Sequence, residues 1–289
     1  MGPSKADFRS KEIVLLVSDF DDATYCVKSQ GDTFTVFAKI HSYQTLLKYG
    51  VEDYLKGIYS AEHFALDFNS SSQQDVVYDF SLTLDLAPDF GEQAESIADQ
   101  VSCIKRNVLA GPFMWYFKTM KSGTSPEEAL KIPFRSNEAM YVKKGKDDSA
   151  VVIFSVAFPE KTDWVVAEVF LREFGDVRRD PAVQLAPVVS FSKNVPMELE
   201  GVAVEEGEGV CYISFALFKR HLDDKAEASV SAICQFRNYL HYHIKCSKAF
   251  MHMRMRKRVD DLLTVLNRAK LPAEAAVEKK AWGGRSFTK

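Results

Sequence analysis

The chain has 289 residues, of which 46% are apolar and 27% are charged. These values are typical of folded globular proteins and exclude wholesale disorder. The 37 basic and 40 acidic residues give a net charge of −3, so nucleic-acid binding through an overall positive charge is excluded and any cationic surface must be local. The longest purely apolar run, Ile13–Val17, is far shorter than the about 20 residues of a membrane-spanning helix.

Five cysteines are spread along the chain at Cys26, Cys103, Cys211, Cys234 and Cys246. Their number is odd, and no two of them have the spacing of a metal or redox motif. We therefore expect free thiols in a reducing cytoplasm, without a disulfide framework or a zinc site. No motif predicts a cofactor or a bound metal.

The first third of the chain alternates between strand-like and helix-like segments. The predicted strands, rich in β-branched and aromatic residues, are Glu12–Ser18, Thr33–Ile40, His63–Phe68 and Val76–Leu86. The segment Gln30–Asp32 is typical of a hairpin turn. Helices are predicted within Tyr43–Tyr59 and Glu92–Lys121, and we expect Pro112 to kink or end the second of them.

The second half returns to strands, separated by charged or glycine-containing spacers. These predicted strands are Ala139–Lys143, Ser149–Phe158, Val165–Phe174, Leu185–Phe191 and Val210–Phe218. Strands without βαβ alternation predict an α+β fold with antiparallel sheets. We expect two related domains, each an antiparallel sheet packed with helices, plus a long C-terminal helix.

The expected division has four parts. Residues 1–122 form a first α+β domain that ends in a long helix, and residues 123–222 form the sheet of a second α+β domain. Residues 223–271 form the long C-terminal helix, which packs on the second domain and on a partner. Residues 272–289 form a tail.

The segment Asp223–Lys270 contains neither proline nor glycine. One helix of this length would be about 70 Å long, whereas a domain of about 170 residues is about 40 Å across. One stripe of apolar residues consists of Val230, Ile233, Leu240, Ile244, Met251, Met255, Val259, Leu262 and Leu266. A second consists of Phe236, Tyr239, His243, Cys246, Phe250 and Met253. Two stripes indicate two packing partners, and one wide face buried inside a larger domain is the alternative.

A cationic stripe follows the same helix at spacings of three and four residues. Its members are Arg237, His241, Lys245, Lys248, His252 and Arg256, and Lys257 and Arg258 add charge nearby. Such a stripe is either a solvated face or a ridge that meets an acidic protein surface.

One segment has the appearance of an enzyme motif. Leu15–Ala23 resembles the first motif of haloacid-dehalogenase-type phosphatases, in which Asp19 would be the nucleophile and Asp21 the acid/base beside Mg²⁺. Ala23 stands where Thr or Val is expected, and no later strand ends in the paired acidic residues that the site needs. A Mg²⁺-dependent phosphatase is therefore the alternative reading, and the main prediction is that the chain is not an enzyme.

Long blocks of the C-terminal half carry a family resemblance. They are Phe236–Ala249, Arg254–Arg256 and Val265–Ala269, preceded in the same order by Lys105–Asn107, Met140–Val142, Arg178–Arg179 and Arg220–His221. On these blocks the chain resembles the family of subunit 2 of the actin-related protein 2/3 complex. The resemblance covers essentially the whole chain and is dense from about residue 139.

The resemblance implies a non-enzymatic structural subunit. In this family the long C-terminal helix pairs with the equivalent helix of subunit 4. Together the two subunits hold the two actin-related subunits and other members of the complex, and lie along the side of the mother actin filament. It also implies a cytoplasmic location in the actin cytoskeleton, at the cell cortex and in cell projections.

The same resemblance implies the contact residues. Those for the filament or a partner are Phe236, Arg237, Tyr239, His241, Lys245, Lys248, His252, Arg254, Arg256, Lys257 and Arg258. Those for packing against a partner helix are Ile244, Met251, Met255, Val259, Leu262 and Leu266. A helix-mediated scaffold unrelated to actin is an alternative that differs only in its partner.

Overall fold

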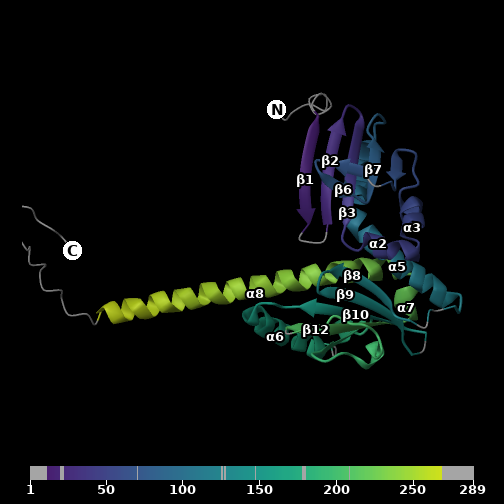
Figure 1. Ribbon diagram of the computed structural model, residues 1–289. Helices are drawn as coiled ribbons and strands as arrows, with labels where there is room; N and C mark the ends of the chain where they lie inside the picture. Colours follow the sequence, from purple (N-terminus) through teal and green to yellow (C-terminus); the bar gives the residue numbers. More distant parts are fainter. Residues whose placement is uncertain are drawn as a thin grey trace, which may run out of the picture. The chain divides into compact units, whose positions relative to one another are not determined.

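The computed structural model describes residues 12–268, apart from 20–22, 70, 125, 127, 147, 178, 179 and 208. It contains two five-stranded antiparallel sheets packed with helices, followed by one long helix (Figure 1). This architecture confirms the predicted α+β class. By its contacts the chain divides into two compact units, residues 1–241 and 242–289, and both sheets lie in the first unit. The domain boundaries expected near residues 122 and 222 stay a prediction.

The first sheet has the strand order β1-β2-β3-β7-β4 and is antiparallel throughout. Its strands are β1 (Ile13–Asp19), β2 (Ala23–Gln30), β3 (Thr33–Ile40), β7 (Phe80–Asp85) and β4 (Phe64–Asp67). The predicted turn at residues 30–32 joins β2 to β3, with Gly31 at a positive φ of 60°. The run predicted as one strand over Val76–Leu86 is instead divided at Asp79, whose carboxylate accepts a hydrogen bond from Ile40 N at 2.9 Å.

Helices cover one face of this sheet, and a small hairpin covers the other. The helices are α2 (Tyr43–Leu46), α3 (Val51–Ile58), α4 (Ala94–Ser102) and α5 (Ile104–Lys121), with the 3₁₀ turns η1 (Leu47–Tyr49) and η2 (Gly91–Gln93). The hairpin consists of β5 (Ser71–Gln73) and β6 (Val76–Tyr78), and Tyr78 packs on Phe37 at 6.0 Å between ring centroids.

Two of the predicted helix boundaries differ from the structure. Gly50, with a left-handed φ of 70°, ends the first predicted helix and separates η1 from α3. The second predicted helix breaks at Cys103 rather than at Pro112, and α5 runs through Pro112. Helices α5 and α3 lie close together at Gly111. A Cβ atom added to this glycine would be 3.1 Å from Val51 Cγ2. Tertiary packing against α3 therefore keeps α5 continuous across its proline.

The second sheet has the order β11-β12-β10-β9-β8, also antiparallel. Its strands are β8 (Leu130–Arg135), β9 (Glu138–Lys144), β10 (Ala150–Ala157), β11 (Val188–Ser192) and β12 (Val210–Leu217). The remaining elements are α6 (Lys161–Val177), α7 (Lys219–Leu222), α8 (Ala226–Arg268) and the 3₁₀ turns η3 (Pro181–Val183) and η4 (Met197–Leu199). None of the helices in the described part of the chain is both long and apolar enough to cross a membrane.

The strand predicted over Val165–Phe174 is wrong, because this segment belongs to helix α6. Its valines favour a strand by local propensity. The buried residues Ala167 and Leu171, however, are four positions apart, which is the spacing of one helix face. Val165 and Val169 lie on the exposed side of α6.

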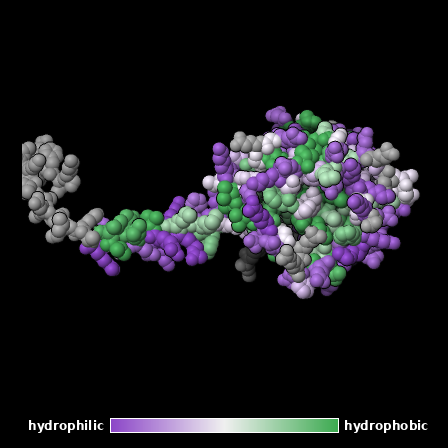
Figure 2. All heavy atoms as spheres, turned by 90° about the horizontal axis from the view of Figure 1, so that it is seen from below, coloured by the Kyte–Doolittle hydropathy of each residue, from purple (hydrophilic) through white to green (hydrophobic). Residues whose placement is uncertain are grey.

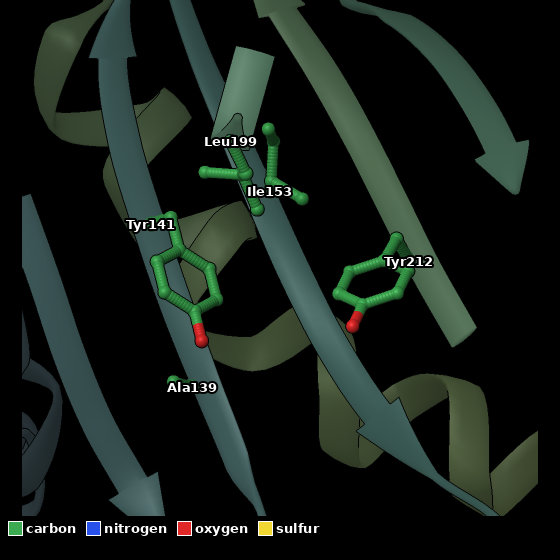
Figure 3. Packing of buried hydrophobic residues seen from close by; sticks show 5 residues of the cluster. All are labelled: Ala139, Tyr141, Ile153, Leu199 and Tyr212. Carbon is green, nitrogen blue, oxygen red and sulfur yellow. The ribbon is translucent and has the colours of Figure 1, made fainter. Parts of the chain in front are cut away.

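The long loop between β11 and β12 closes one face of the second sheet. Leu199 of η4 packs over Ala139, Tyr141, Ile153 and Tyr212 of the sheet (Figure 3). The backbone of Glu205 is held by two phenol groups: its N–H donates to Tyr141 Oη at 3.1 Å, and its carbonyl accepts from Tyr212 Oη at 2.8 Å. The loop is thus a structural layer of the fold rather than a solvated spacer.

Replacing Leu199 with alanine should lower the free energy of unfolding by about 2–5 kcal/mol, because it removes a buried side chain from this layer. Met197 of the same 3₁₀ turn is 86% exposed, against 1% for Leu199. Met197→Ala is therefore the matched control, with a change within about 0.5 kcal/mol. Urea denaturation followed by tryptophan fluorescence measures both, and equal midpoints for the two variants would contradict the packing role of the loop.

Candidate functional site: helix α8 and its anchors

Helix α8 is continuous from Ala226 to Arg268, which confirms the predicted long helix over the described residues. Residues 226–241 belong to the first compact unit and residues 242–268 to the second. Val230, Ile233 and Leu240 of the first part are buried. The tail predicted over residues 272–289 lies outside the described residues.

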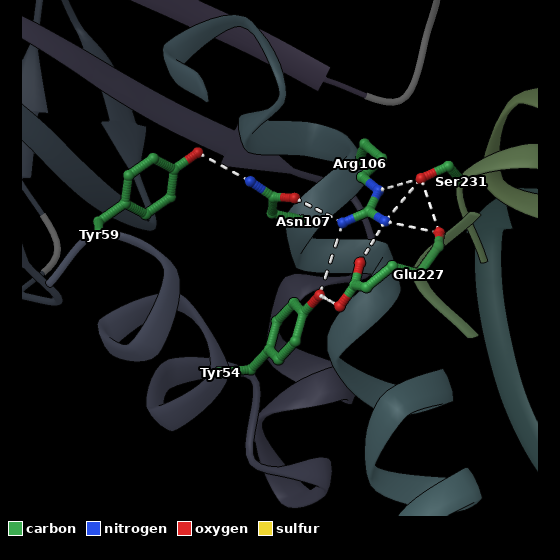
Figure 4. Close-up of polar contacts among 6 residues, drawn as sticks. All are labelled: Tyr54, Tyr59, Arg106, Asn107, Glu227 and Ser231. Carbon is green, nitrogen blue, oxygen red and sulfur yellow. Dashed lines mark hydrogen bonds and ion pairs between the residues drawn. The ribbon is translucent and has the colours of Figure 1, made fainter. Parts of the chain in front are cut away.

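The base of α8 is held by a polar network around Arg106 of α5 (Figure 4). The Arg106 guanidinium donates to Ser231 Oγ at 2.6 and 3.0 Å, and forms an ion pair with Glu227 at 2.6 Å. Tyr54 of α3 donates its phenol proton to the same carboxylate at 3.0 Å. The network therefore ties helices that pack on the first sheet to the first two turns of α8. In the sequence, the only indication of it was the polar triplet Lys105–Asn107 within an otherwise apolar stretch of helix.

The network is partly desolvated: the side chain of Arg106 is 16% exposed and that of Glu227 is 57% exposed. Burial raises the pKa of Tyr54 to about 12, and the nearby carboxylate of Glu227 adds to the effect. Burial also raises the pKa of the Cys234 thiol, one turn farther along α8, to about 12. Both groups therefore stay neutral at physiological pH, and the charges at this site are those of Arg106 and Glu227.

A buried ion pair anchors α8 farther along its first third, at Arg237. Arg237 binds Glu138, at the start of β9, with Nε to Oε2 at 2.8 Å and Nη2 to Oε1 at 3.1 Å. The same carboxylate accepts a third hydrogen bond from Ala157 N at 3.0 Å. Three donors on one carboxylate compensate the loss of water around its charge, and the bidentate geometry fixes the rotation of the helix here.

The prediction of one exposed cationic stripe is wrong for its first two members. The side chains of Arg237 and His241 are only 13% and 20% exposed. His241 stacks on Phe158 with ring centroids 4.8 Å apart. Phe236 packs on Phe154 and Phe215, at 5.4 and 4.7 Å. The second sheet lies against this part of the helix, so these three side chains serve the fold.

The later part of α8 is exposed around its circumference: every residue from 249 to 268 is exposed. Met255, Val259, Leu262 and Leu266, four of the predicted partner-packing residues, are 54% to 64% exposed, and Met251 is 43% exposed. Figure 2 shows hydrophobic atoms gathered toward the end of the helix and hydrophilic atoms nearer its middle. Ile244, also predicted for partner packing, is already buried in the single chain.

The basic residues of this part are His252, Arg254, Arg256, Lys257, Arg258 and Arg268, all exposed. Lys245 and Tyr239 are exposed, and Lys248 is half-buried. Arg254 lies over the ring of Phe250 at 5.6 Å. The structure thus brings apolar and cationic side chains together on one exposed helix segment.

The enzyme-like motif is engaged differently from a phosphatase site. Asp19 forms an ion pair with Lys105 at 2.7 Å, and Asp21 lies outside the described residues. Among the residues that the structure describes, no three or more His, Cys, Asp or Glu side chains gather so as to hold a metal ion.

Replacing Arg237 with alanine should cost about 3–5 kcal/mol of unfolding free energy, because it leaves the Glu138 carboxylate buried without its partner. Arg256→Ala, on an exposed turn of the same helix, should change the stability by less than about 0.5 kcal/mol. Thermal and urea unfolding of the two variants make the comparison. Equal stability would show that the buried pair does not hold α8.

Cys234 reports on the Arg106 network. At pH 8 a thiol with a pKa of about 12 is ~10⁻⁴ ionised, so Cys234 should be labelled far more slowly than the exposed Cys246. Removing the Arg106 charge alone would disfavour the Cys234 thiolate, but burial is the larger cause of its raised pKa. Arg106→Ala should therefore raise the labelling rate of Cys234 at least tenfold by freeing the base of α8 and exposing the thiol. Lys105→Ala, which removes the neighbouring cation from a different ion pair, is the control. Quantitative peptide mass spectrometry after a short iodoacetamide pulse measures both, and equal rates would refute the anchoring role.

Comparison with known proteins agrees with this reading of the chain. The family model of "Arp2/3 complex, 34 kD subunit p34-Arc" matches residues 36–273. The "Actin-related protein 2/3 complex subunit 2" of Schizosaccharomyces pombe is 37% identical, over 95% of this chain and 90% of that protein. The protein of the same name from Dictyostelium discoideum is 34% identical, over 94% of this chain and 90% of its own length. The chain therefore belongs to the p34-Arc family, the 34 kD subunit of the Arp2/3 complex.

Proposed function

We propose that this chain is a core subunit of the actin-nucleating, filament-branching Arp2/3 complex, that α8 pairs with subunit 4, and that its cationic residues contact the side of the mother filament. The family is one of structural subunits and not of enzymes. The function to be explained is therefore a set of contacts rather than a reaction. We expect these contacts to be made in the cytoplasm, within the actin cytoskeleton of the cell cortex and of cell projections.

The exposed apolar residues of α8 are the observation that carries the proposal. Met251, Met255, Val259, Leu262 and Leu266 follow one another at spacings of 4, 4, 3 and 4 residues. At 100° per residue they fall within an arc of about 80°. Such a stripe is what one helix presents to another in coiled-coil packing. Leaving it in water is unfavourable, since each such side chain gains about 1.5–3 kcal/mol on full burial.

Charge on both sides of the stripe favours an acidic partner surface. Arg254 and Arg256 lie about 100° to either side of Met255 on the helix, and Lys257 and Arg258 add two further cations. Because the whole chain carries a net charge of −3, this cluster is a local feature that can orient the chain on an acidic protein surface. The acidic side of an actin filament is the surface that we propose for the cations left outside the helix pair.

The double substitution Met255→Asp with Leu262→Asp should abolish co-purification with subunit 4, because pairing would bury two unpaired carboxylates. Both residues are exposed in the single chain, so its own fold should be unchanged. Thr264→Asp, about 180° away from Met255 on the same helix, adds a carboxylate outside the stripe and should leave pairing intact. Tandem-affinity purification after co-expression compares the two variants with the unchanged chain. Retained pairing of the double variant would reject the helix-pairing proposal.

Charge reversal at Lys245 and Lys248 should weaken filament binding by about tenfold at low salt, because two attractive charges become repulsive. Pairing with subunit 4 should persist. The matched control is reversal of Lys146 and Lys225, two exposed lysines elsewhere in the chain, with the same change in net charge. Filament cosedimentation of the assembled complex at two salt concentrations gives the measurement. Equal losses in the two double variants would mean that net charge alone acts, and that these lysines form no contact.

A further inference from the structure

The exposed segment of α8 from Met251 to Leu266 changes the sign of its charge near its centre. Its first half carries four cations, Arg254, Arg256, Lys257 and Arg258. Its second half carries Asp260 and Asp261 and no basic residue. All six charged side chains are exposed. The segment therefore presents a basic half and an acidic half along one helix, on either side of its apolar stripe.

The apolar stripe is symmetric about a point between residues 258 and 259. Met251 and Leu266 are equally far from this point, and so are Met255 and Leu262. If a second copy of α8 lies antiparallel with the same centre, Met251 of one copy is level with Leu266 of the other. Met255 is then level with Leu262, and Val259 lies beside its own counterpart. Apolar side chains meet apolar side chains over about 22 Å of helix.

The same antiparallel arrangement brings opposite charges together. Asp260 lies on the same side of the stripe as Arg256, and Asp261 lies on the side of Arg258. Equivalent flanks of two antiparallel helices face each other. Arg256 of one copy is therefore about one residue away from the level of Asp260 of the other, and Arg258 is about two residues from that of Asp261. A parallel pair would instead place the cations of the two copies side by side, where they repel.

We propose that, in the absence of subunit 4, two copies of this chain form an antiparallel homodimer through residues 251–266 of α8. Both the apolar spacing and the charge order of the segment are complementary to themselves, and this selects a second copy as the occupant. With about five large apolar side chains from each copy the interface is small, so the dimer is weak and reversible, with a dissociation constant above about 1 μM.

The homodimer uses the stripe that we propose for subunit 4, so the two pairings exclude each other. A free chain then keeps its stripe out of water until subunit 4 replaces the second copy. Only this competition rests on the proposed function. The homodimer itself follows from the sequence and the exposure of α8.

Sedimentation velocity of the full chain, from about 1 to about 100 μM, should show a monomer that becomes a dimer as concentration rises. Asp260→Lys with Asp261→Lys should raise the dissociation constant at least tenfold, because attractive pairs become repulsive. Glu173→Lys with Asp176→Lys, on an exposed turn of α6, makes the same change in net charge and is the matched control. A monomer at every concentration, or equal losses in the two variants, would overturn the proposal.

A mixture of two variants tests the charge order itself. Arg256→Glu with Arg258→Glu should also be monomeric alone, because its glutamates face the aspartates of the other copy. Mixed in equal amounts with Asp260→Lys and Asp261→Lys, it should restore a dimer that contains one copy of each, since every lysine then meets a glutamate. Native mass spectrometry identifies this heterodimer by its mass. Two variants that stay monomeric in the mixture would contradict the antiparallel pairing.

Single cysteines introduced in a Cys246→Ser background test the orientation. Val259→Cys lies at the centre of the pair and should cross-link to its counterpart under mild oxidation. Met251→Cys should not, because an antiparallel arrangement places it about 22 Å from its counterpart along the helix. A disulfide-linked dimer formed through Met251→Cys would mean a parallel pair and would overturn the proposal.

Addition of subunit 4 separates this proposal from the proposed function. An equal amount of subunit 4 should convert the homodimer into a heterodimer. A chain that is monomeric alone and yet pairs with subunit 4 would overturn the homodimer and leave the helix pairing intact. A homodimer that subunit 4 does not displace would support the self-pairing of α8 and reject its pairing with subunit 4.

Discussion

The buried pair between Glu138 and Arg237 is the interaction on which the functional helix depends. Its two bonds, at 2.8 and 3.1 Å, join the start of β9 to the first third of α8 and fix the rotation of the helix at that point. A single apolar contact would allow the helix to slide or turn, whereas a bidentate pair with a third donor from Ala157 has one arrangement. The Arg106 network is a second polar anchor, at Glu227 and Ser231 near the start of α8. Together, two mostly buried guanidinium groups hold a helix whose residues from 249 onward are all exposed.

Two apolar surfaces are exposed in the single chain, and the same physical argument applies to both. The stripe from Met251 to Leu266 and the edge strand β1 each combine large exposed side chains with regular backbone geometry. Isolated proteins seldom leave such surfaces in water, because exposed apolar patches and bare strand edges promote association. A chain that folds as one subunit of a complex can keep such a surface when a neighbouring subunit covers it, as we propose for the stripe of α8. The polar anchors thus hold the first part of α8, and the apolar stripe farther along is the surface that we propose for a partner helix.

Several elements followed from local pattern, and others did not. Runs rich in β-branched and aromatic residues located β1, β3 and β4, and the absence of proline and glycine located α8. Helix α6 was missed because its valines favour a strand locally, whereas packing of Ala167 and Leu171 selected a helix. Strand β8 was missed because Pro133 argues against a strand, although an edge tolerates it. For the candidate site, the exposed residues from Met251 onward were predicted by periodicity. The inward positions of Arg237 and His241 were not, because the start of β9 and the end of β10, far away in sequence, supply Glu138 and Phe158.

Periodicity, composition and breakers act over a few residues, so the linear order of amino acids was sufficient for the class of fold, for a helix of more than forty residues and for its apolar and cationic stripes. Which cation lies inside and which lies in water is a property of contacts between segments that are about a hundred residues apart, as with Glu138 and Arg237. The same holds for the bare edge at Ile13–Val17, since a strand becomes an edge only through the order in which the sheet assembles. The desolvation of a side chain and the order of strands in a sheet depend on contacts between segments that are distant in sequence. A pattern of neighbouring residues therefore cannot predict them.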